Sequence, residues 1–295
     1  MILDLVELGQ DGFLRGGEPW TPAAPFYAVI GDPVSHSLSP RLHNAGMEDR
    51  ELATEYVALH VTAERLPYLK QGGFARHLAG FNVTAPHKEA VAILCDGRTD
   101  QARSLGAVNT VKVEDGSWLG HNTDSGGVVA VLSQAWPEAS PPDVATVLGA
   151  GGSARAAVDA LARWGVPRIQ VRNRSQAGRD RFAKWLAAGS VEAEVAVEPL
   201  VPGRPDAPDG AALWICCLAG GVATDPFLPV AAGNGPSLLL DLRYGEQLPS
   251  EAPPLGFQHV DGLPVLMMQG GLAFAWWFGP PVPWTAFQAA LAMDD

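Results

Sequence analysis

The segment His121-Asn122-Thr123-Asp124-Ser125-Gly126-Gly127 joins two different sequence patterns. It follows an alternating, strand-like run over residues 108–113 and precedes an apolar helical run over 128–136. A glycine-rich turn of the nucleotide-binding kind, Gly149-Ala150-Gly151-Gly152, comes after that helix. A carboxylate on the link between two lobes, just upstream of a cofactor loop, is expected to border a cleft. We therefore interpret the rest of the chain relative to Asp124.

Strand and helix patterns alternate upstream of this segment. The predicted strands are 26–31, 55–60, 80–84, 106–111 and 117–120, and the predicted helices are 41–50 and 64–78. Ser39-Pro40 precedes the first helix, since serine is a good N-cap and proline suits the first turn. Residues 1–25 are rich in Gly, Pro and acids and are predicted to be an extension. This alternation predicts an α/β lobe.

The downstream half contains continuous apolar strands of the kind that a parallel sheet buries. Its predicted strands are 144–148, 168–172, 193–197, 213–218 and 237–242. Helices are predicted over 154–164, 179–188 and 263–278, and a proline-rich surface loop over 199–210. The whole pattern predicts a two-lobed α/β fold. Residues 1–125 form the first lobe with 262–295 packing back onto it, and residues 126–261 form a Rossmann-type cofactor lobe.

The composition excludes several classes of partner. The net charge is −12 over 295 residues, which argues against a nucleic acid or an acidic membrane surface as partner. Three cysteines do not form a disulfide framework, and the N-terminus carries acids where a signal peptide carries bases. No apolar run reaches the roughly 18 residues that a membrane span needs. A cytoplasmic protein is therefore expected.

Gly149-Ala150-Gly151-Gly152-Ser153-Ala154 fits the G-x-G-x-x-A fingerprint of dinucleotide-binding proteins. The motif follows a predicted strand and opens a predicted helix, so its backbone can approach a pyrophosphate at a helix N-terminus. The alternative is a glycine turn needed only for packing. The next strand ends in Arg172-Asn173-Arg174-Ser175, where an NAD site would place a carboxylate. Arg174 favours the 2′-phosphate of NADP, unless it is only a solvated surface charge.

Lys88 and Asp124 are the candidates for proton transfer. An ammonium and a carboxylate that face each other in a cleft can hold a substrate hydroxyl and move its proton while hydride leaves the same carbon. Spacing alone fits an ordinary surface ion pair equally well. Ser37 and Ser39 at a helix N-terminus can form a small carboxylate site, or Ser39 can simply cap the helix. The histidines near them lack metal-ligand spacing, so no metal site is expected.

Seven short segments, in this order, resemble the shikimate dehydrogenase family. They are Ser35-His-Ser-Leu-Ser-Pro40 with His43-Asn44, Asn82-Val-Thr-Ala-Pro-His-Lys88, Gly106-Ala-Val-Asn-Thr110, Gly120-His-Asn-Thr-Asp124, Gly149-Ala-Gly-Gly152, Asn173-Arg-Ser175 and Leu266-Met-Met-Gln269. The resemblance spans residues 26 to 278. It implies an NADP-dependent oxidoreductase that interconverts 3-dehydroshikimate and shikimate in chorismate and aromatic amino-acid biosynthesis, as a monomer or homodimer.

The resemblance also implies residue roles. Lys88 and Asp124 match the catalytic pair, and Ser37 and Ser39 match the serines that bind the substrate carboxylate. The residues that match the remaining substrate contacts are Thr84, Asn109, Tyr244 and Gln269. Those that match the 2′-phosphate clamp are Asn173, Arg174 and Ser175. Gly262 matches a backbone contact near the nicotinamide, and Leu242 a neighbour of that ring.

Three positions depart from the family pattern, all in the cofactor lobe. Gly178 stands where the clamp usually has a second basic residue, with Arg179 one position later. Cys216-Cys217-Leu218 replaces the usual Asn-x-Thr, and Gly245 follows Tyr244 where proline is common. Two other functions stay open: a quinate/shikimate dehydrogenase with a broader substrate range or NAD use, and a non-catalytic NADPH-binding regulator. A regulator has no need for Lys88 and Asp124.

Overall fold

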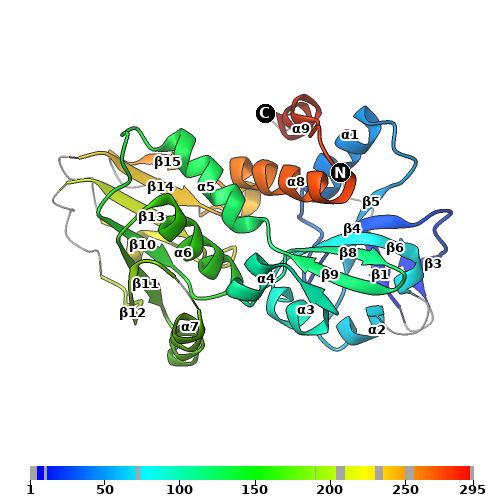
Figure 1. The fold of residues 1–295 in the computed structure, drawn as a ribbon, viewed down its shortest axis with the longest axis horizontal. Helices are drawn as coiled ribbons and strands as arrows, with labels where there is room; N and C mark the ends of the chain where they lie inside the picture. The colour runs from blue at the N-terminus through cyan, green and yellow to red at the C-terminus, as the bar shows by residue number, and fades with distance from the viewer. Residues whose placement is uncertain are drawn as a thin grey trace. The chain divides into compact units, whose positions relative to one another are not determined.

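The computed structural model describes residues 5–9, 12–70, 74–189, 191–203, 210–229, 235–249 and 256–292. The chain divides into two compact units (Figure 1). The first comprises Met1–Thr123 with Gln269–Asp295, and the second comprises Asp124–Met268. Each unit has its own sheet, and the predicted α/β fold with a Rossmann-type cofactor lobe is confirmed.

The sheet of the first unit has nine strands among the described residues, in the order β3-β2-β1-β5-β4-β6-β8-β9-β7. These strands are β1 (Leu5–Leu8), β2 (Phe13–Arg15), β3 (Glu18–Trp20), β4 (Phe26–Gly31), β5 (Tyr56–His60), β6 (Leu78–Val83), β7 (Gly97–Arg98), β8 (Thr110–Glu114) and β9 (Ser117–His121). Strand β4 pairs in parallel with β5 and β6, whereas β8 runs antiparallel to β6 and β9. The carboxyl ends of β4, β6 and β9 therefore meet the amino end of β8 at one edge of this sheet.

Helices cover both faces of this sheet. They are α1 (Ser39–Asp49), α2 (Leu66–Lys70), α3 (Lys88–Leu94), α4 (Asp100–Leu105), α8 (Leu263–Phe278), α9 (Trp284–Leu291) and the short 3₁₀ helix η1 (Ala75–His77). Buried Leu69 of α2 and Val91 of α3 join Phe26, Phe81 and Trp118 of the sheet in one apolar core. On the other face, α1, the second half of α8 and α9 pack together (Figure 1).

Within the described part of the second unit, the sheet has six parallel strands in the order β12-β11-β10-β13-β14-β15. They are β10 (Val144–Leu148), β11 (Arg168–Asn173), β12 (Glu194–Pro199), β13 (Ala212–Cys216), β14 (Ser237–Asp241) and β15 (Gln258–Val260). In chain order this is 3-2-1-4-5-6, the doubly wound arrangement of dinucleotide-binding domains. The order reverses between β10 and β13, so a ligand is expected at the carboxyl ends of these two strands.

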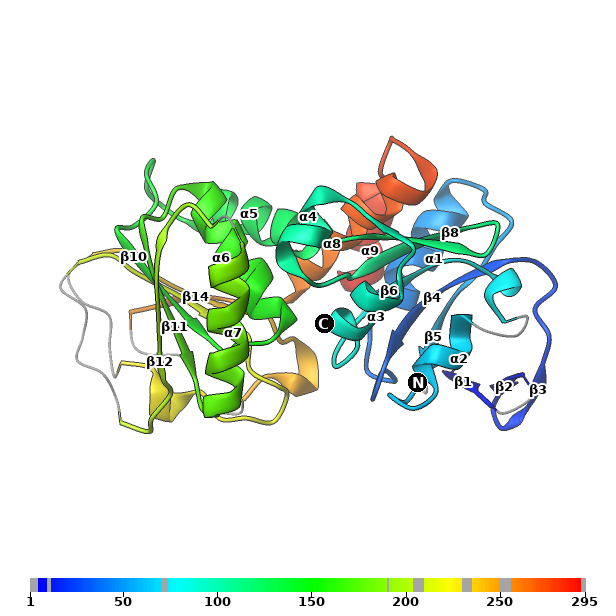
Figure 2. The same cartoon turned by 60° about the horizontal axis from the view of Figure 1, so that its bottom comes forward.

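The helices of the second unit are α5 (Asp124–Ala135), α6 (Gly152–Trp164) and α7 (Gln176–Ala188), with the 3₁₀ helices η2 (Asp225–Phe227) and η3 (Gly245–Gln247). Helices α6 and α7 lie on one face of the sheet (Figure 2), and α5 packs against α6. The opposite face holds a second apolar cluster in which Trp214 and Leu239 of the sheet meet Leu200, Leu228 and Phe257 of the loops.

Three local predictions were wrong. Residues 1–25 are not only an extension, because β1 pairs in parallel with β5 and buries Val6 and Leu8. The helix predicted over 64–78 is short, since α2 ends at Lys70 and Leu78 already belongs to β6. Gly106 ends α4 in a left-handed conformation (φ +60°) instead of starting a strand. The predicted surface loop at 199–210 falls largely outside the described residues.

Candidate active site

The two serines predicted to bind a carboxylate follow β4. Both side chains are buried, and the Ser39 backbone N–H donates to Oγ of Ser37 at 3.3 Å. The N-cap of α1 is Leu38 without a side-chain cap, so the capping role predicted for Ser39 is wrong and Ser37 receives this N–H instead. Both hydroxyls are held at the carboxyl end of a parallel strand, next to a helix start.

Thr84 follows the neighbouring strand β6 and lies against the end of β4. Its backbone N–H donates to the carbonyl of Ile30 at 2.9 Å. A methyl group at Gly31 would lie 2.5 Å from Cγ2 of Thr84, so this close approach requires glycine. Thr84 and the loop that carries the serines therefore share one edge of the sheet.

Lys88 is the first residue of α3, at the end of the turn that leaves β6. Its carbonyl accepts a hydrogen bond from the backbone N–H of Val108 at 2.9 Å. The preceding residue, His87, is buried, and its Nε2 contacts the carbonyl of Val61 at 2.5 Å. These contacts hold the start of α3 beside residue 108, one position before Asn109.

Asn109 is the centre of a buried polar cluster at the same edge. Its Nδ2 donates to Oγ1 of Thr123 at 2.9 Å and to Oε1 of Gln269 at 3.3 Å. The backbone N–H of Thr123 donates back to Oδ1 of Asn109 at 2.8 Å. The structure thus brings Asn109 and Gln269 together from positions 160 residues apart. Thr123 was not predicted as a site residue. Its position directly before Asp124, within the segment His121–Gly127, could have indicated this role.

Asp124 is the first residue of α5 and belongs to the second unit. Asp124 follows Thr123 directly in the chain, so a single peptide bond links it to a member of the Asn109 cluster. The next residue, Ser125, is buried and donates its hydroxyl to Asp159 of α6. The start of α5 is therefore joined on one side to the polar cluster and on the other to the helix that follows the glycine turn.

The glycine turn lies between β10 and α6, beside the point where the strand order reverses. Gly149 has φ +113°, and a methyl group there would lie 2.9 Å from the carbonyl oxygen of Cys217. Gly151 is the N-cap of α6 and has no side chain to cover the first N–H groups. The motif's other residues are Ala150, within the turn, and Gly152, Ser153 and Ala154, at the start of α6. This arrangement fits a dinucleotide pyrophosphate.

The predicted 2′-phosphate clamp connects β11 to α7. The exposed Ser175 is the N-cap of α7 and accepts from the Gly178 N–H at 3.2 Å, while Asn173 Nδ2 donates to the Ser175 carbonyl at 3.2 Å. Arg179 donates to the carbonyls of Asn173 and Arg174 at 2.8 and 3.0 Å. A methyl group at Gly178 would lie 2.3 Å from Nδ2 of Asn173. A side chain at this position would displace the Asn173 amide, and Arg179 supports the backbone of the clamp.

Leu242, Tyr244 and Gly262 lie at the carboxyl ends of β14 and β15. The Leu242 N–H donates to the carbonyl of Cys216 at 3.0 Å, and the Gly262 N–H donates to the carbonyl of Arg243 at 2.8 Å. A methyl group at Gly262 would lie 2.3 Å from the Leu242 carbonyl oxygen, so the two backbones are in direct contact. Tyr244 is half-buried just before η3.

Arg243 is a buried support that sequence reasoning missed. Its side chain donates to Asp241 through Nε at 2.9 Å and through a terminal nitrogen at 2.6 Å. Its other terminal nitrogen donates to the carbonyl of Val222 at 2.6 Å. This guanidinium therefore hydrogen-bonds both to the last residue of β14 and to the loop that follows β13.

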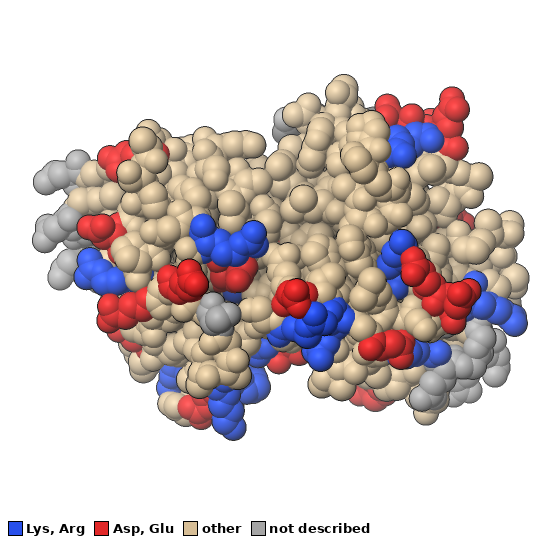
Figure 3. Space-filling view, viewed as in Figure 1, with Lys and Arg blue, Asp and Glu red and all other residues tan. Residues whose placement is uncertain are grey.

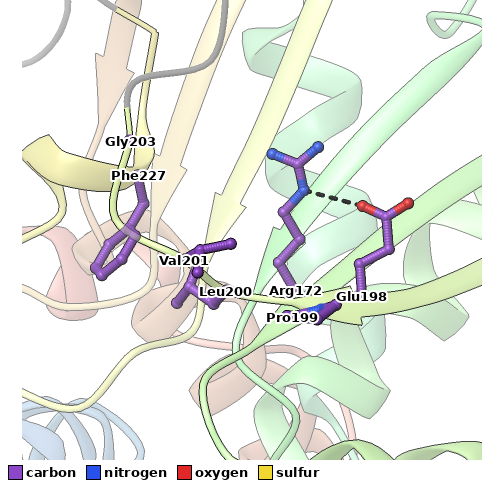
Figure 4. A pocket seen from close by; sticks show the side chains of 7 residues that line it. All are labelled: Arg172, Glu198, Pro199, Leu200, Val201, Gly203 and Phe227. Carbon is purple, nitrogen blue, oxygen red and sulfur yellow. Dashed lines mark ion pairs between the residues drawn. The ribbon is translucent and has the colours of Figure 1, made fainter.

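A cavity of about 530 Å³ lies at the carboxyl ends of β11 and β12 (Figure 4). Within it, Nε of Arg172 pairs with Oε2 of Glu198 at 3.4 Å. The rest of its lining is Pro199, Leu200, Val201, Gly203 and Phe227. Arg172 directly precedes the clamp, so this cavity and the clamp share the carboxyl edge of the sheet.

On the face drawn in Figure 3, the described Lys and Arg side chains lie interspersed with Asp and Glu instead of forming one broad basic area. Among the described residues, no helix is long and apolar enough to cross a membrane.

Comparisons with known proteins agree with this geometry. A family described as "Shikimate dehydrogenase substrate binding domain" matches residues 29–111. A shikimate dehydrogenase (NADP(+)) of Anaeromyxobacter sp. is 37% identical over 270 residues, covering 90% of this chain and 95% of the relative.

Solved structures show the same relationship. Shikimate dehydrogenase from Aquifex aeolicus superposes with a TM-score of 0.73 at 30% identity, covering 92% of this chain and all of that one. Shikimate 5-dehydrogenase from Thermus thermophilus in complex with NADP(H) and shikimate gives 0.68 at 28% identity, covering 90% of this chain and 97% of that one. The similarity covers about nine-tenths of the chain, and the chain belongs to the shikimate dehydrogenase family.

Proposed function

We propose that this protein catalyses the reversible, NADPH-dependent reduction of 3-dehydroshikimate to shikimate. The observation that carries the proposal is the cluster of Asn109, Thr123 and Gln269 at the sheet edge where Lys88 begins α3, with Asp124 next in the chain. Relatives named as shikimate dehydrogenases, and a neighbour in complex with NADP(H) and shikimate, support it.

The substrate carboxylate is assigned to the hydroxyls of Ser37 and Ser39. Thr84, Asn109, Gln269 and Tyr244 are assigned to the ring hydroxyls and the carboxylate. Amide and hydroxyl groups suit this task, because a site built to hydrogen-bond a hydroxyl rejects analogues that lack it.

Lys88 and Asp124 are assigned to proton transfer. NADPH, when bound, supplies the hydride to the ring carbonyl carbon. The carbonyl oxygen gains negative charge in that step, and the Lys88/Asp124 pair delivers the proton that makes it an alcohol. In the reverse direction the same pair removes the proton of the hydroxyl.

The cofactor is assigned to the second unit. The pyrophosphate is expected at Gly149–Ala154, and the 2′-phosphate at Asn173, Arg174 and Ser175. Leu242 and Gly262 are assigned to the nicotinamide end. The residues present fit this dinucleotide, because Gly151 at the start of α6 has open space beside it that a side chain would enter.

The direct test is a rate measurement from nicotinamide absorbance, with shikimate or quinate as substrate and NADP or NAD as cofactor. We expect the highest kcat/KM for shikimate with NADP. Comparable rates with quinate would favour the broader quinate/shikimate dehydrogenase. Binding of NADPH without turnover of either substrate would favour the regulator.

The role assigned to Lys88 is tested by substituting this residue. Lys88→Ala is expected to lower kcat by about 10²–10⁴-fold, the usual contribution of a general acid–base group, with an unchanged Kd for NADPH. A kcat close to that of the unmodified protein would remove Lys88 from the mechanism. We further propose that the enzyme acts in the cytoplasm as a monomer or homodimer, which sedimentation and cell fractionation would decide.

A further inference from the structure

A continuous chain of buried hydrogen bonds lies behind Asn109. The Tyr56 hydroxyl donates to Oδ1 of Asn82 at 2.7 Å, and Nδ2 of Asn82 donates to Oγ1 of Thr110 at 3.0 Å. The Thr110 hydroxyl then donates to Oδ1 of Asn109 at 2.9 Å. These side chains come from β5, β6 and β8 of one sheet and from the residue before β8, and all four are at most 5% exposed.

Main-chain partners decide which way each amide points. The Thr123 N–H can only donate, so the atom of Asn109 that it contacts at 2.8 Å must be the oxygen. The Asn109 carbonyl can only accept, so the atom of Asn82 that contacts it at 3.1 Å must be the nitrogen. Neither amide can flip without losing a buried hydrogen bond.

The two fixed amides also determine the Thr110 hydroxyl. It accepts a hydrogen bond from the Asn82 NH₂ group and donates one to Oδ1 of Asn109, which can only accept. The chain is polarised in one direction, from Tyr56 toward Asn109, and such chains strengthen each bond. As a result Asn109 presents its N–H groups to the Thr123 hydroxyl and to Gln269, while its oxygen accepts from the Thr123 backbone N–H and the Thr110 hydroxyl.

We propose that Thr110, directly, and Tyr56, through Asn82 and Thr110, are positioning residues that hold the Asn109 amide as a hydrogen-bond donor to a ring hydroxyl of the substrate. This inference rests on the proposed function, because it assumes that Asn109 contacts shikimate. Neither Thr110 nor Tyr56 needs to touch the substrate. Their effect is to exclude the orientation in which Asn109 would present an acceptor.

The test compares Thr110→Val with Thr110→Ser. Valine removes the hydroxyl at nearly the same volume, so the Asn109 amide loses one of the bonds that define its orientation. We expect KM for shikimate to rise about ten-fold, which corresponds to about 1.4 kcal/mol. KM for NADP and kcat should change less than about three-fold, because the lost interaction is uniform binding of one substrate. Serine restores the hydroxyl and should bring KM for shikimate back to within about two-fold.

Tyr56→Phe is the second, milder variant, since it removes only the far end of the chain. Its KM for shikimate should rise about three-fold, and combining it with Thr110→Val should add less than the sum of the two effects. The inference is overturned if Thr110→Val leaves KM for shikimate unchanged, if it raises both KM values together, or if serine fails to restore it. An unmodified protein that does not turn over shikimate would instead refute the proposed function itself.

Discussion

The ion pair between Asp241 and Arg243 gives the sharpest stability prediction. The two side chains are 1% and 3% exposed, so neither charge is compensated by water. Replacing Arg243 by Met removes three side-chain hydrogen bonds and leaves the Asp241 carboxylate without its cationic partner. Breaking a buried pair in this way costs about 3–5 kcal/mol. At roughly 2–4 °C per kcal/mol for units of this size, the melting temperature should fall by about 10 °C.

Thermal unfolding followed by circular dichroism measures this loss. The matched control is the double variant Arg243→Met with Asp241→Leu, which removes both charges and replaces them with apolar volume. Such replacements are often neutral, so we expect the control to recover most of the lost stability. A loss below about 1 kcal/mol in the single variant, or a double variant no more stable than the single one, would refute the reasoning.

Three further predictions concern the cofactor and pH. Arg174→Ala should raise the Kd of NADP about ten-fold or more while leaving that of NAD nearly unchanged, because only NADP carries the 2′-phosphate; fluorescence titration of both cofactors measures this. Gly149→Ala should raise KM for NADP at least about ten-fold, because glycine alone tolerates φ +113° there without strain; an unchanged KM would contradict the assigned pyrophosphate site. Burial lowers the pKa of His43 to about 3 from 6.5, so between these values the unfolded chain binds more protons and the free energy of unfolding falls as the pH is lowered. His43→Leu should lack this component, which amounts to about 3 kcal/mol between pH 7 and pH 4; parallel denaturant titrations of both proteins at the two pH values test it.

The second unit was predictable because its signals are local. The run over 144–148 is apolar at every position except Thr146, and the structure forms β10 over the same residues. Glycines at 149, 151 and 152 follow at once, and α6 begins at Gly152. A buried parallel strand that turns directly into a helix leaves few other conformations for this sequence, so the cofactor loop could be located without coordinates.

The first unit was harder to predict because its signals are not local. Residues 5–8 look like part of a polar extension, yet they pair with β5 more than 50 residues later. The apolar periodicity over 64–78 suggested one helix, but Leu78 pairs with Phe26 and continues as β6. Sheet pairing between distant segments decided the structure in both places, against an expected extension in one and a local helical pattern in the other.

The sequence by itself determined the chemistry that the chain carries: the glycine turn, the basic clamp, Lys88, Asp124 and the two serines are local motifs whose order is meaningful without coordinates. Only the tertiary structure decided how Asn109 is held. Asn82 and Gln269 contact it from distant positions, and Tyr56 acts on it through Asn82. Gln269 reaches Asn109 because α8 returns to the first unit, where Trp277 donates to the carbonyl of Val111 at 3.0 Å. Hydrogen-bond direction depends on which buried donors and acceptors meet, and that is a property of packing between distant segments.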